Sequence, residues 1–255
     1  MKLYRIQSNQ PNAKPCYAMR QGGKFQPVQN VWEKDFSAAG EPIEEAEAVI
    51  LAPSAPGKVV CVGLNYHAHV QEMGHEEHPD PVIFLKPSTA VIGANETIRA
   101  PKWLTRVDFE AEVAIVMGKC CKDVKAEHAQ DMVLGYTALN DVTARDIQKT
   151  DGQWTRAKGF DTFCPMGPSI ETEFDWRDAG VRCLLNGRVM QEGRTSSMMH
   201  DMNAIIAFIS SVMTLEAGDV IATGTPSGIG PMQDGDRVVV EIEGLDTLCN
   251  TVKTI

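Results

Sequence analysis

The sequence of 255 residues, with 43% apolar and 23% charged residues, is long enough for one large globular domain, or for a small domain beside a larger one. Its net charge of −10 argues against a nucleic-acid partner, because affinity for nucleic acid depends on Lys and Arg side chains at the phosphates. There is no apolar run of membrane-span length, no signal peptide and no CxxC spacing among the seven cysteines, so we expect a cytoplasmic protein with reduced thiols, no membrane partner and no zinc site.

Short strand-like pieces separated by polar turns occupy the first part of the chain. The connector that follows them ends in Pro53, Pro56 and Gly57, which interrupt regular structure. We therefore predict a small strand-rich N-terminal domain over residues 1–55 and a larger domain over residues 56–255.

In the larger domain, predicted strands outnumber predicted helices, and the helices are scattered among the strands. A short helix is expected with Asn65 as a candidate N-cap and Gly74 as its end, and residues 126–135 show helical spacing. The pair Asn186–Gly187 indicates a hairpin turn, and Asp201 precedes the segment with the clearest helical pattern. Because the sequence lacks a Rossmann or P-loop glycine pattern, we predict a mixed α+β, mainly β fold rather than a doubly wound one.

Two glutamates stand at the head of an apolar run. Glu110 and Glu112 precede Val113–Met117, and residues i and i+2 of a strand share one face. Two carboxylates beside a core repel each other, and a divalent cation such as Mg²⁺ or Mn²⁺ would compensate them. Asp141, at the end of another apolar stretch, is our candidate for a third ligand. The alternative is a solvated strand face, but Ala111 between the glutamates favours burial.

A second candidate group is His69 and Glu72, which are three residues apart and so share one face of a helix. Such a pair can act as a general base, with the carboxylate orienting the imidazole. The alternative is a chance pair on a surface helix. The acidic loop HEEHPDP follows, and we expect residues 67–80 to close over the site as a lid when substrate binds.

Two further segments favour substrate binding. Lys158 precedes a compact loop with Pro165 and Pro168, where an ammonium group could hold a substrate carboxylate. Thr225 lies in a Gly/Pro-rich turn whose NH groups and hydroxyl could bind a carboxylate or enolate oxygen. The alternatives are an ordinary surface lysine and a plain connecting turn.

Taken together, these stretches resemble the fumarylacetoacetate hydrolase family, and they cover nearly all of residues 58–230. The matching stretches, in order, are VGLNYHAHVQEMG, PVIFLKP, DFEAEVAIVMGK, GYTALNDVTARDIQ, KGFDTFCPMGP, LNGRVMQEG and DVIATGTPSGIG.

The resemblance implies a β-sandwich roll with helices packed outside it, and a homodimer, since many relatives are dimeric. It implies a site for Mg²⁺, Mn²⁺ or Ca²⁺, a catalytic His-x-x-Glu pair and further residues that hold the substrate. In the same order, these fall on Glu110, Glu112 and Asp141; on His69 and Glu72; and on Lys158, Gln148 and Thr225.

The resemblance also implies a small 2-oxo acid or β-diketo acid as the substrate. The expected reaction is C–C bond hydrolysis of the acylpyruvase or fumarylpyruvate type, or decarboxylation or tautomerisation through a metal-stabilised enolate, as in the breakdown of aromatic compounds. One alternative is a dehydratase of 2-keto-3-deoxy sugar acids. Another is a non-catalytic metal-binding or metabolite-binding protein, which the presence of both His69 and Glu72 argues against.

Overall fold

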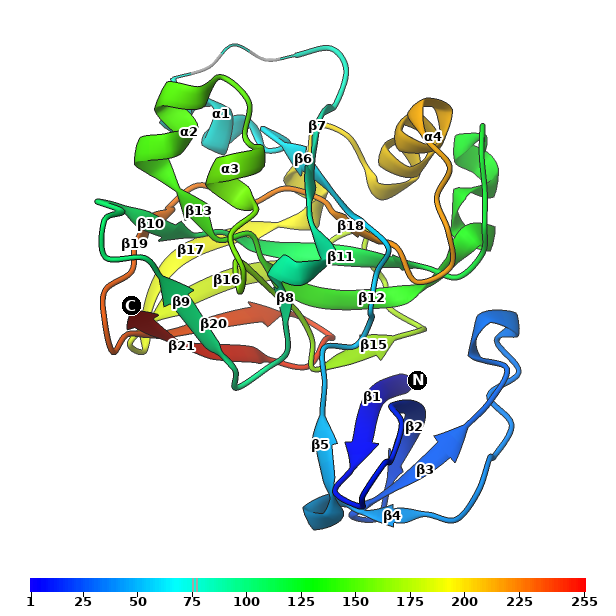
Figure 1. The fold of residues 1–255 in the computed structure, drawn as a ribbon. Coiled ribbons are helices and arrows are strands. Elements are labelled where there is room, and N and C mark those ends of the chain that lie inside the picture. The colour runs from blue at the N-terminus through cyan, green and yellow to red at the C-terminus, as the bar shows by residue number, and fades with distance from the viewer. Residues whose placement is uncertain (75, 77) are drawn as a thin grey trace.

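The computed structural model of the protein describes residues 1–255 apart from residues 75 and 77. Figure 1 shows a mainly β molecule in which the helices lie outside the sheets, so the expected mixed, mainly β fold class is confirmed.

The larger sheet runs through the whole molecule in the order β4-β3-β2-β1-β15-β12-β11-β18-β6-β7, with β5 also paired to β1. Its strands are β1 (Lys2–Ser8), β2 (Cys16–Gln21), β3 (Lys24–Val28), β4 (Ile43–Glu44), β5 (Ala48–Ile50), β6 (Val59–Gly63), β7 (Val82–Lys86), β11 (Ala111–Met117), β12 (Val133–Asn140), β15 (Ser169–Glu171) and β18 (Val220–Ala222).

A five-stranded sheet has the order β17-β16-β20-β21-β9, and two smaller sheets have the orders β13-β10-β19 and β14-β8. The bounds are β8 (Val91–Ile92), β9 (Thr97–Ala100), β10 (Val107–Phe109), β13 (Thr143–Ala144), β14 (Cys164–Pro165), β16 (Gly180–Leu185), β17 (Arg188–Arg194), β19 (Gly230–Pro231), β20 (Arg237–Ile242) and β21 (Leu248–Thr254). The predicted turn at Asn186–Gly187 connects β16 and β17, and both residues have the positive φ that such a turn requires.

Strand β11 is buried on both of its faces, which explains why its sequence is apolar without alternation. Val113 and Ile115 belong to a core cluster that also holds residues of β16 and β20, whereas Ala114 and Val116 belong to a cluster with residues of β6 and β18. A strand covered on both faces has no side on which polar residues reach water. The predicted buried strand is therefore confirmed.

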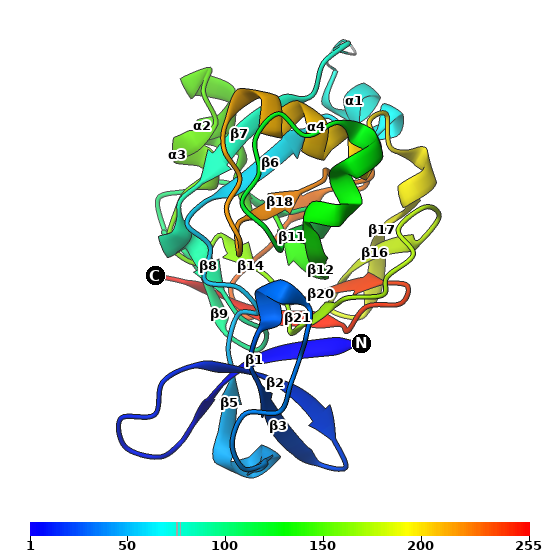
Figure 2. The same ribbon diagram turned by 90° about the vertical axis from the view of Figure 1, so that its right-hand side faces the viewer.

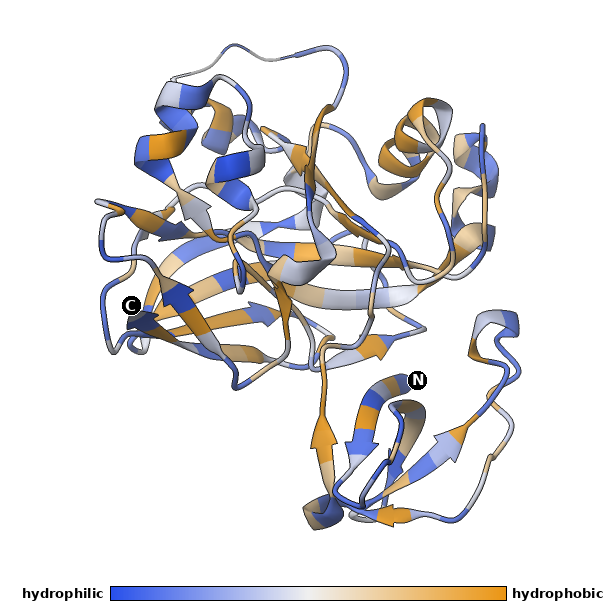
Figure 3. Ribbon diagram, viewed as in Figure 1, coloured by the Kyte–Doolittle hydropathy of each residue, from blue (hydrophilic) through white to orange (hydrophobic). Residues whose placement is uncertain are grey.

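The α-helices lie outside the sheets. The α-helices are α1 (His67–Met73), α2 (Arg145–Asp151), α3 (Thr155–Lys158) and α4 (Met202–Val212), and the 3₁₀ helices are η1 (Val31–Glu33), η2 (Glu45–Glu47), η3 (Ser88–Ala90), η4 (Ala126–Met132) and η5 (Thr195–Ser197). In Figure 1, α1, α2 and α3 gather at one end, and α4 lies beside η4. Figure 3 shows the apolar residues of α4 in orange. No described helix combines the length and apolar character that crossing a membrane requires.

Two predicted helix details are corrected and two are confirmed. Asp201 caps α4 by accepting a hydrogen bond from the Ala204 amide at 2.8 Å, and Gly74 ends α1 in the left-handed conformation. Asn65 does not cap α1, because its side-chain amide donates instead to the carbonyl of Thr223 at 2.8 Å. Of residues 126–135, for which the spacing predicts a helix, residues 126–132 form the 3₁₀ helix η4 rather than an α-helix, and residues 133–135 already belong to β12.

Strands β1 to β5 lie at the end of the molecule away from α1, α2 and α3 (Figures 1 and 2). The pairing of β1 with β15 joins them to the rest of the larger sheet. The domain boundary at residues 55 and 56 stays a prediction.

Candidate active site

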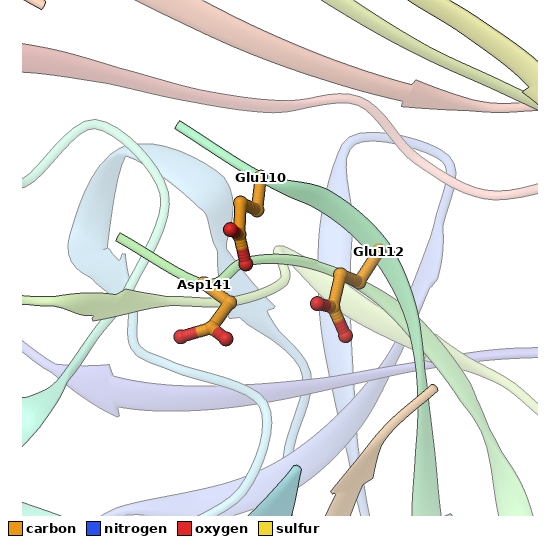
Figure 4. A group of neighbouring side chains, drawn as sticks. All are labelled: Glu110, Glu112 and Asp141. Carbon is orange, nitrogen blue, oxygen red and sulfur yellow. The ribbon is translucent and has the colours of Figure 1, made fainter. Parts of the chain in front are cut away.

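Three carboxylates meet where β11 and β12 pair. Glu110 lies in the break between β10 and β11, Glu112 is in β11, and Asp141 follows β12 directly. The register pairs Ala111 with Asn140, and the Asp141 amide donates to the Glu110 carbonyl at 2.9 Å. All three side chains are buried, and each offers an oxygen within 4.8 Å of the others' (Figure 4). We call Glu110, Glu112 and Asp141 the acidic triad.

Buried basic side chains neutralise two members of the acidic triad. The Lys158 ammonium donates to Glu110 at 2.7 Å and to Asp141 at 2.6 Å. Arg145 also donates to Glu110, and Lys86 donates to Asp141. Among the described residues, no basic side chain forms an ion pair with the third member, Glu112, which accepts the Gly224 amide at 2.8 Å.

The pKa values of the two glutamates move in opposite directions for this reason. Burial alone would raise the pKa of Glu110, but Lys158 and Arg145 outweigh it and hold that pKa well below its usual range, with a further contribution from His69. Burial raises the pKa of Glu112 well above its usual range, and the negative charges of Asp141 and Glu110 add to the effect. Glu110 and Asp141 are therefore neutralised by ion pairs, whereas Glu112 is a buried carboxyl group without a basic partner among the described residues.

The acidic triad fits a divalent cation such as Mg²⁺ or Mn²⁺. Its donors are all oxygens, they converge, and one of them lacks a cationic partner among the described residues. Hard divalent cations prefer such ligands and leave other positions to water or substrate. Glu110, Glu112 and Asp141 are the residues that would hold the cation.

The predicted His–Glu pair forms on α1. The His69 Nδ1 atom lies 3.0 Å from Glu72 Oε2, and the His69 side chain is buried and lines the same cavity as the acidic triad. The second Glu72 oxygen accepts the Gly228 amide at 3.0 Å. Of the predicted lid segment 67–80, His75 and Glu77 lie outside the described residues, and lid closure stays a prediction.

The loop of residues 223–228 connects the acidic triad to the His–Glu pair. The Gly224 amide binds Glu112, and the Gly228 amide binds Glu72. Both glycines have a positive φ, and a Cβ at Gly228 would lie 2.2 Å from the Met190 carbonyl oxygen. Only glycine fits this conformation and this close approach, so the sequence places the two donors through its glycines.

The Thr225 hydroxyl is part of the same loop but is engaged within the protein. It donates to the Ala111 carbonyl at 2.8 Å and accepts from the Gln191 amide at 2.8 Å. Gln191 is fully buried and also accepts the Ala111 amide at 2.9 Å. Thr225 lines the cavity, and its predicted contact with substrate requires an exchange of these hydrogen bonds.

Gln148 and Lys158, both predicted to bind substrate, also line the cavity. The Gln148 carbonyl oxygen accepts a hydrogen bond from Arg145 at 2.7 Å, and Arg145 additionally donates to Asp108 at 2.9 Å. The structure therefore brings all the predicted site residues to one cavity or its border. Their roles stay predictions.

The other residues that line the cavity are mostly apolar or aromatic. They are Val62, Gly63, Leu64, Met73, Phe84 and Trp154. The rings of Phe84 and Trp154 are 5.3 Å apart and nearly perpendicular, and the Lys158 ammonium lies 5.0 Å from the centroid of the Phe84 ring. A cation above a ring face is attracted electrostatically, so Phe84 helps to hold Lys158 in place.

Sequence reasoning missed Lys86, Arg145 and the aromatic residues that line the cavity. Lys86 is the last residue of the strand predicted from PVIFLKP, and Arg145 stands three residues before Gln148. A lysine that ends a buried strand, and an arginine that opens a helix near a predicted ligand, are signals that could have identified both.

Comparison with known proteins decides the family. A family model described as fumarylacetoacetate (FAA) hydrolase C-terminal matches residues 58–253. The chain belongs to the fumarylacetoacetate hydrolase family. The resemblance seen in its motifs is confirmed, and the chain is an enzyme of this family.

Relatives of the fumarylacetoacetate hydrolase family include two solved structures. A 2-hydroxyhepta-2,4-diene-1,7-dioate isomerase from Mycobacterium marinum is 47% identical, with a TM-score of 0.90 over 100% of this chain and 98% of its own. A 5-carboxymethyl-2-hydroxymuconate delta-isomerase from Mycobacterium smegmatis is 44% identical, with a TM-score of 0.92 over 100% of both chains. The mitochondrial oxaloacetate tautomerase fahd2 of Xenopus laevis is 41% identical over 80% of this chain and 68% of its own.

Proposed function

We propose that the protein catalyses keto–enol or double-bond isomerisation of a small 2-oxo dicarboxylic acid with the help of a divalent cation. The observation that carries the proposal is that the buried His69, which is paired with Glu72, and the acidic triad line one small cavity. The names of the relatives, two isomerases and an oxaloacetate tautomerase, support the same class of reaction.

The proton transfer is assigned to His69. Its Nδ1 atom faces Glu72, which leaves Nε2 as the ring nitrogen that accepts a proton. Nε2 removes a proton from the carbon next to the 2-oxo group, and the protonated ring returns it to the oxygen, or to a carbon further along a conjugated chain. One C–H bond breaks and one O–H or C–H bond forms, so no atom is gained or lost.

The charged groups of the substrate are held by the other residues of the cavity. A divalent cation held by Glu110, Glu112 and Asp141 would supply Lewis-acid stabilisation of developing negative charge. Lys158 and Gln148 bind the carboxylate that flanks it, and the loop at Thr225 binds a second oxygen of the substrate. Burial of Lys158 and Thr225 strengthens their electrostatic interactions with the reacting atoms.

A second candidate is hydrolysis of a C–C bond in a β-diketo acid. The same His69–Glu72 pair, in a cavity with room for about one water molecule, favours it, because His69 could take a proton from water instead of carbon. Decarboxylation of oxaloacetate, which needs no general base, and dehydration of a 2-keto-3-deoxy sugar acid remain alternatives for the same acidic triad.

The test is a substrate panel of oxaloacetate, acylpyruvates, a carboxymethyl-hydroxymuconate and a 2-keto-3-deoxy sugar acid, each with Mg²⁺, with Mn²⁺ and with a chelator. For oxaloacetate in D₂O, we expect deuterium to enter C3 faster with the enzyme than without it, and no matching release of CO₂. Cleavage or CO₂ release at the rate of deuterium entry would instead assign the hydrolase or decarboxylase. The expected homodimer stays a proposal, which light scattering of the same preparation tests.

A further inference from the structure

We propose that Trp154 determines the length of the substrate, because its indole separates the active-site cavity from a larger apolar pocket behind it. The proposal rests on the proposed function, since it concerns how long a chain the same 2-oxo acid site accepts. Without the indole, the two spaces form one binding site that takes 2-oxo acids with an apolar or conjugated chain.

The two spaces differ in size and share a wall. The free volume beside the acidic triad is about 20 Å³, which is room for about one water molecule. The free volume of the adjacent pocket is about 620 Å³, within the range of small-molecule binding sites. Phe84 and Trp154 line both spaces, so these two aromatic rings form the partition between them.

The indole of Trp154 is fixed by close contact with the backbone of β6. A Cβ added at Gly63 would lie 2.4 Å from the Cζ3 atom of Trp154, so the ring packs directly on this glycine. The ring also meets Phe84, edge to face, with the ring centroids 5.3 Å apart. The Trp154 carbonyl accepts the Lys158 amide at 3.0 Å, which anchors its backbone to α3. Close packing therefore fixes the ring that forms the partition, and this packing requires glycine at position 63.

The chemistry of the outer pocket identifies what it would take. Its lining includes the apolar residues Val60, Val82, Ile83, Leu85 and Met213 and the polar residues Gln153 and Thr155, and no charged residue is among the described residues that line it. Such a surface favours an aliphatic or conjugated chain and disfavours a second carboxylate. The carboxylate and the 2-oxo group stay at the acidic triad, and only the distal chain would cross the partition.

The experiment uses three variants and a matched control on the full chain with Mg²⁺. Trp154→Ala removes the indole, Trp154→Phe shortens it, and Gly63→Ala pushes it away from β6. Trp103→Ala is the control, because Trp103 is 62% exposed and lines neither space. The substrates are oxaloacetate and acylpyruvates whose acyl chain grows from two to six carbons, and calorimetric Kd values for the same acids provide a second readout.

We expect the ratio of kcat/KM for the longest acylpyruvate to that for the shortest to rise at least about tenfold in Trp154→Ala, since one methylene group in an apolar pocket is worth about tenfold. Gly63→Ala should move the ratio in the same direction, Trp154→Phe by less, and Trp103→Ala not at all. The Kd values should follow the same order. Adding Met213→Ala to Trp154→Ala should reduce the gain, because Met213 lines only the outer pocket.

An equal change for all chain lengths in Trp154→Ala would overturn the proposal. A Trp154→Ala protein with a changed molecular mass in light scattering and an unchanged kcat/KM ratio would also overturn it, because the outer pocket would then be an interface between chains. If the wild type turns over none of the acids, the proposed function is wrong, and the Kd series still tests the partition.

Discussion

The acidic triad and Asp246 both involve carboxylates that accept from basic side chains, but they differ in how many carboxylates share the donors. At Asp246, one carboxylate accepts from Lys2, from the Tyr4 hydroxyl at 2.7 Å and from the Ser169 hydroxyl at 2.8 Å. In the acidic triad, three buried carboxylates lie together, and one of them, Glu112, has no ion-pair partner among the described residues.

The difference separates a structural ion pair from a candidate site. Asp246 fastens β1 to the turn that precedes β21, and its single charge is more than satisfied. In the acidic triad, burial and repulsion raise the pKa of Glu112, which is an unfavourable state that folding alone does not explain. A buried carboxyl group without a basic partner among the described residues therefore indicates a ligand site, whereas the fully paired carboxylate of Asp246 indicates a structural role.

The largest expected effect comes from Glu112→Gln, which replaces the carboxyl group that has no ion-pair partner among the described residues without changing its shape. Activity should fall by about 10³-fold or more because the divalent cation loses a ligand, and calorimetry should show lost Mg²⁺ affinity. The melting temperature in chelator should rise, since less like charge is buried. Glu192→Gln, at an exposed glutamate paired with Arg182, is the control and should change none of these. Unchanged Mg²⁺ affinity in Glu112→Gln would contradict the metal assignment.

His69→Ala should lower kcat by about 10²–10⁴-fold, the usual contribution of a general base, measured on the best substrate of the panel. His128→Ala is a matched control, because His128 also has an acidic residue, Asp131, three positions later, but is 63% exposed. Wild-type turnover by His69→Ala would show that another group moves the proton, even if the acidic triad binds metal.

Gly228→Ala tests whether the loop of residues 223–228 positions Glu72. The new Cβ would meet the Met190 carbonyl, so the Gly228 amide must move away from Glu72. We expect kcat to fall by about 10–100-fold and stability to fall by about 1–3 kcal/mol. Gly235→Ala has the same positive φ but nothing within 4 Å of its Cβ, so it controls for backbone strain alone. Equal losses of kcat in the two variants would show that the loop does not position Glu72.

Asp246→Asn should cost about 1–2 kcal/mol in urea unfolding and leave kcat unchanged. Burial would raise the pKa of Asp246, but hydrogen bonds from Lys2, Tyr4 and Ser169 outweigh it and lower that pKa. A lowered carboxyl pKa stabilises the fold above the unfolded value near 4, and this contribution is lost as the pH falls through the folded pKa. The cost of the substitution should therefore shrink in acid, and a cost that grows there would be inconsistent with this account.

The smallest expected effect is that of the divalent cation on wild-type stability. Because the folded pKa of Glu112 is raised, stability in chelator should fall as the pH rises from the unfolded pKa toward the folded one. Saturating Mg²⁺ should offset this fall by about 2–4 °C in melting temperature, the shift that 1 kcal/mol produces in a chain of this size. Equal melting temperatures with Mg²⁺ and chelator across this range would count against a cation on the acidic triad.

Local patterns predicted the elements that carry their own signal. The apolar run of β11, the turn at Asn186–Gly187 and the cap of α4 at Asp201 each depend on a few neighbouring residues. The spacing of Glu110 and Glu112 predicted their proximity, but Glu110 lies in a strand break, where its amide bonds to the Asn140 side chain at 2.9 Å. That break depends on a partner 30 residues away and has no local signature.

The residues that sequence reasoning missed act through distant partners. Lys86 meets Asp141 across 55 positions, and Arg145 meets Glu110 across 35. Single basic residues in apolar segments do not reveal their partners through hydrophobic periodicity. The contact of Trp154 with Gly63 could not be predicted from the sequence either, because it depends on how α3 and β6 are placed relative to each other.

The loop of residues 223–228 also has a consequence for how the enzyme gains activity during folding. Its hydrogen bonds to Glu112 and Glu72 join groups that are 112 and 156 positions apart in the chain. Contacts of such separation close large chain loops and form slowly compared with hairpins and helices. We expect recovery of activity after dilution from denaturant to follow the slowest refolding phase, and a chain cut between Glu112 and Gly224 to be inactive until its two pieces reassemble.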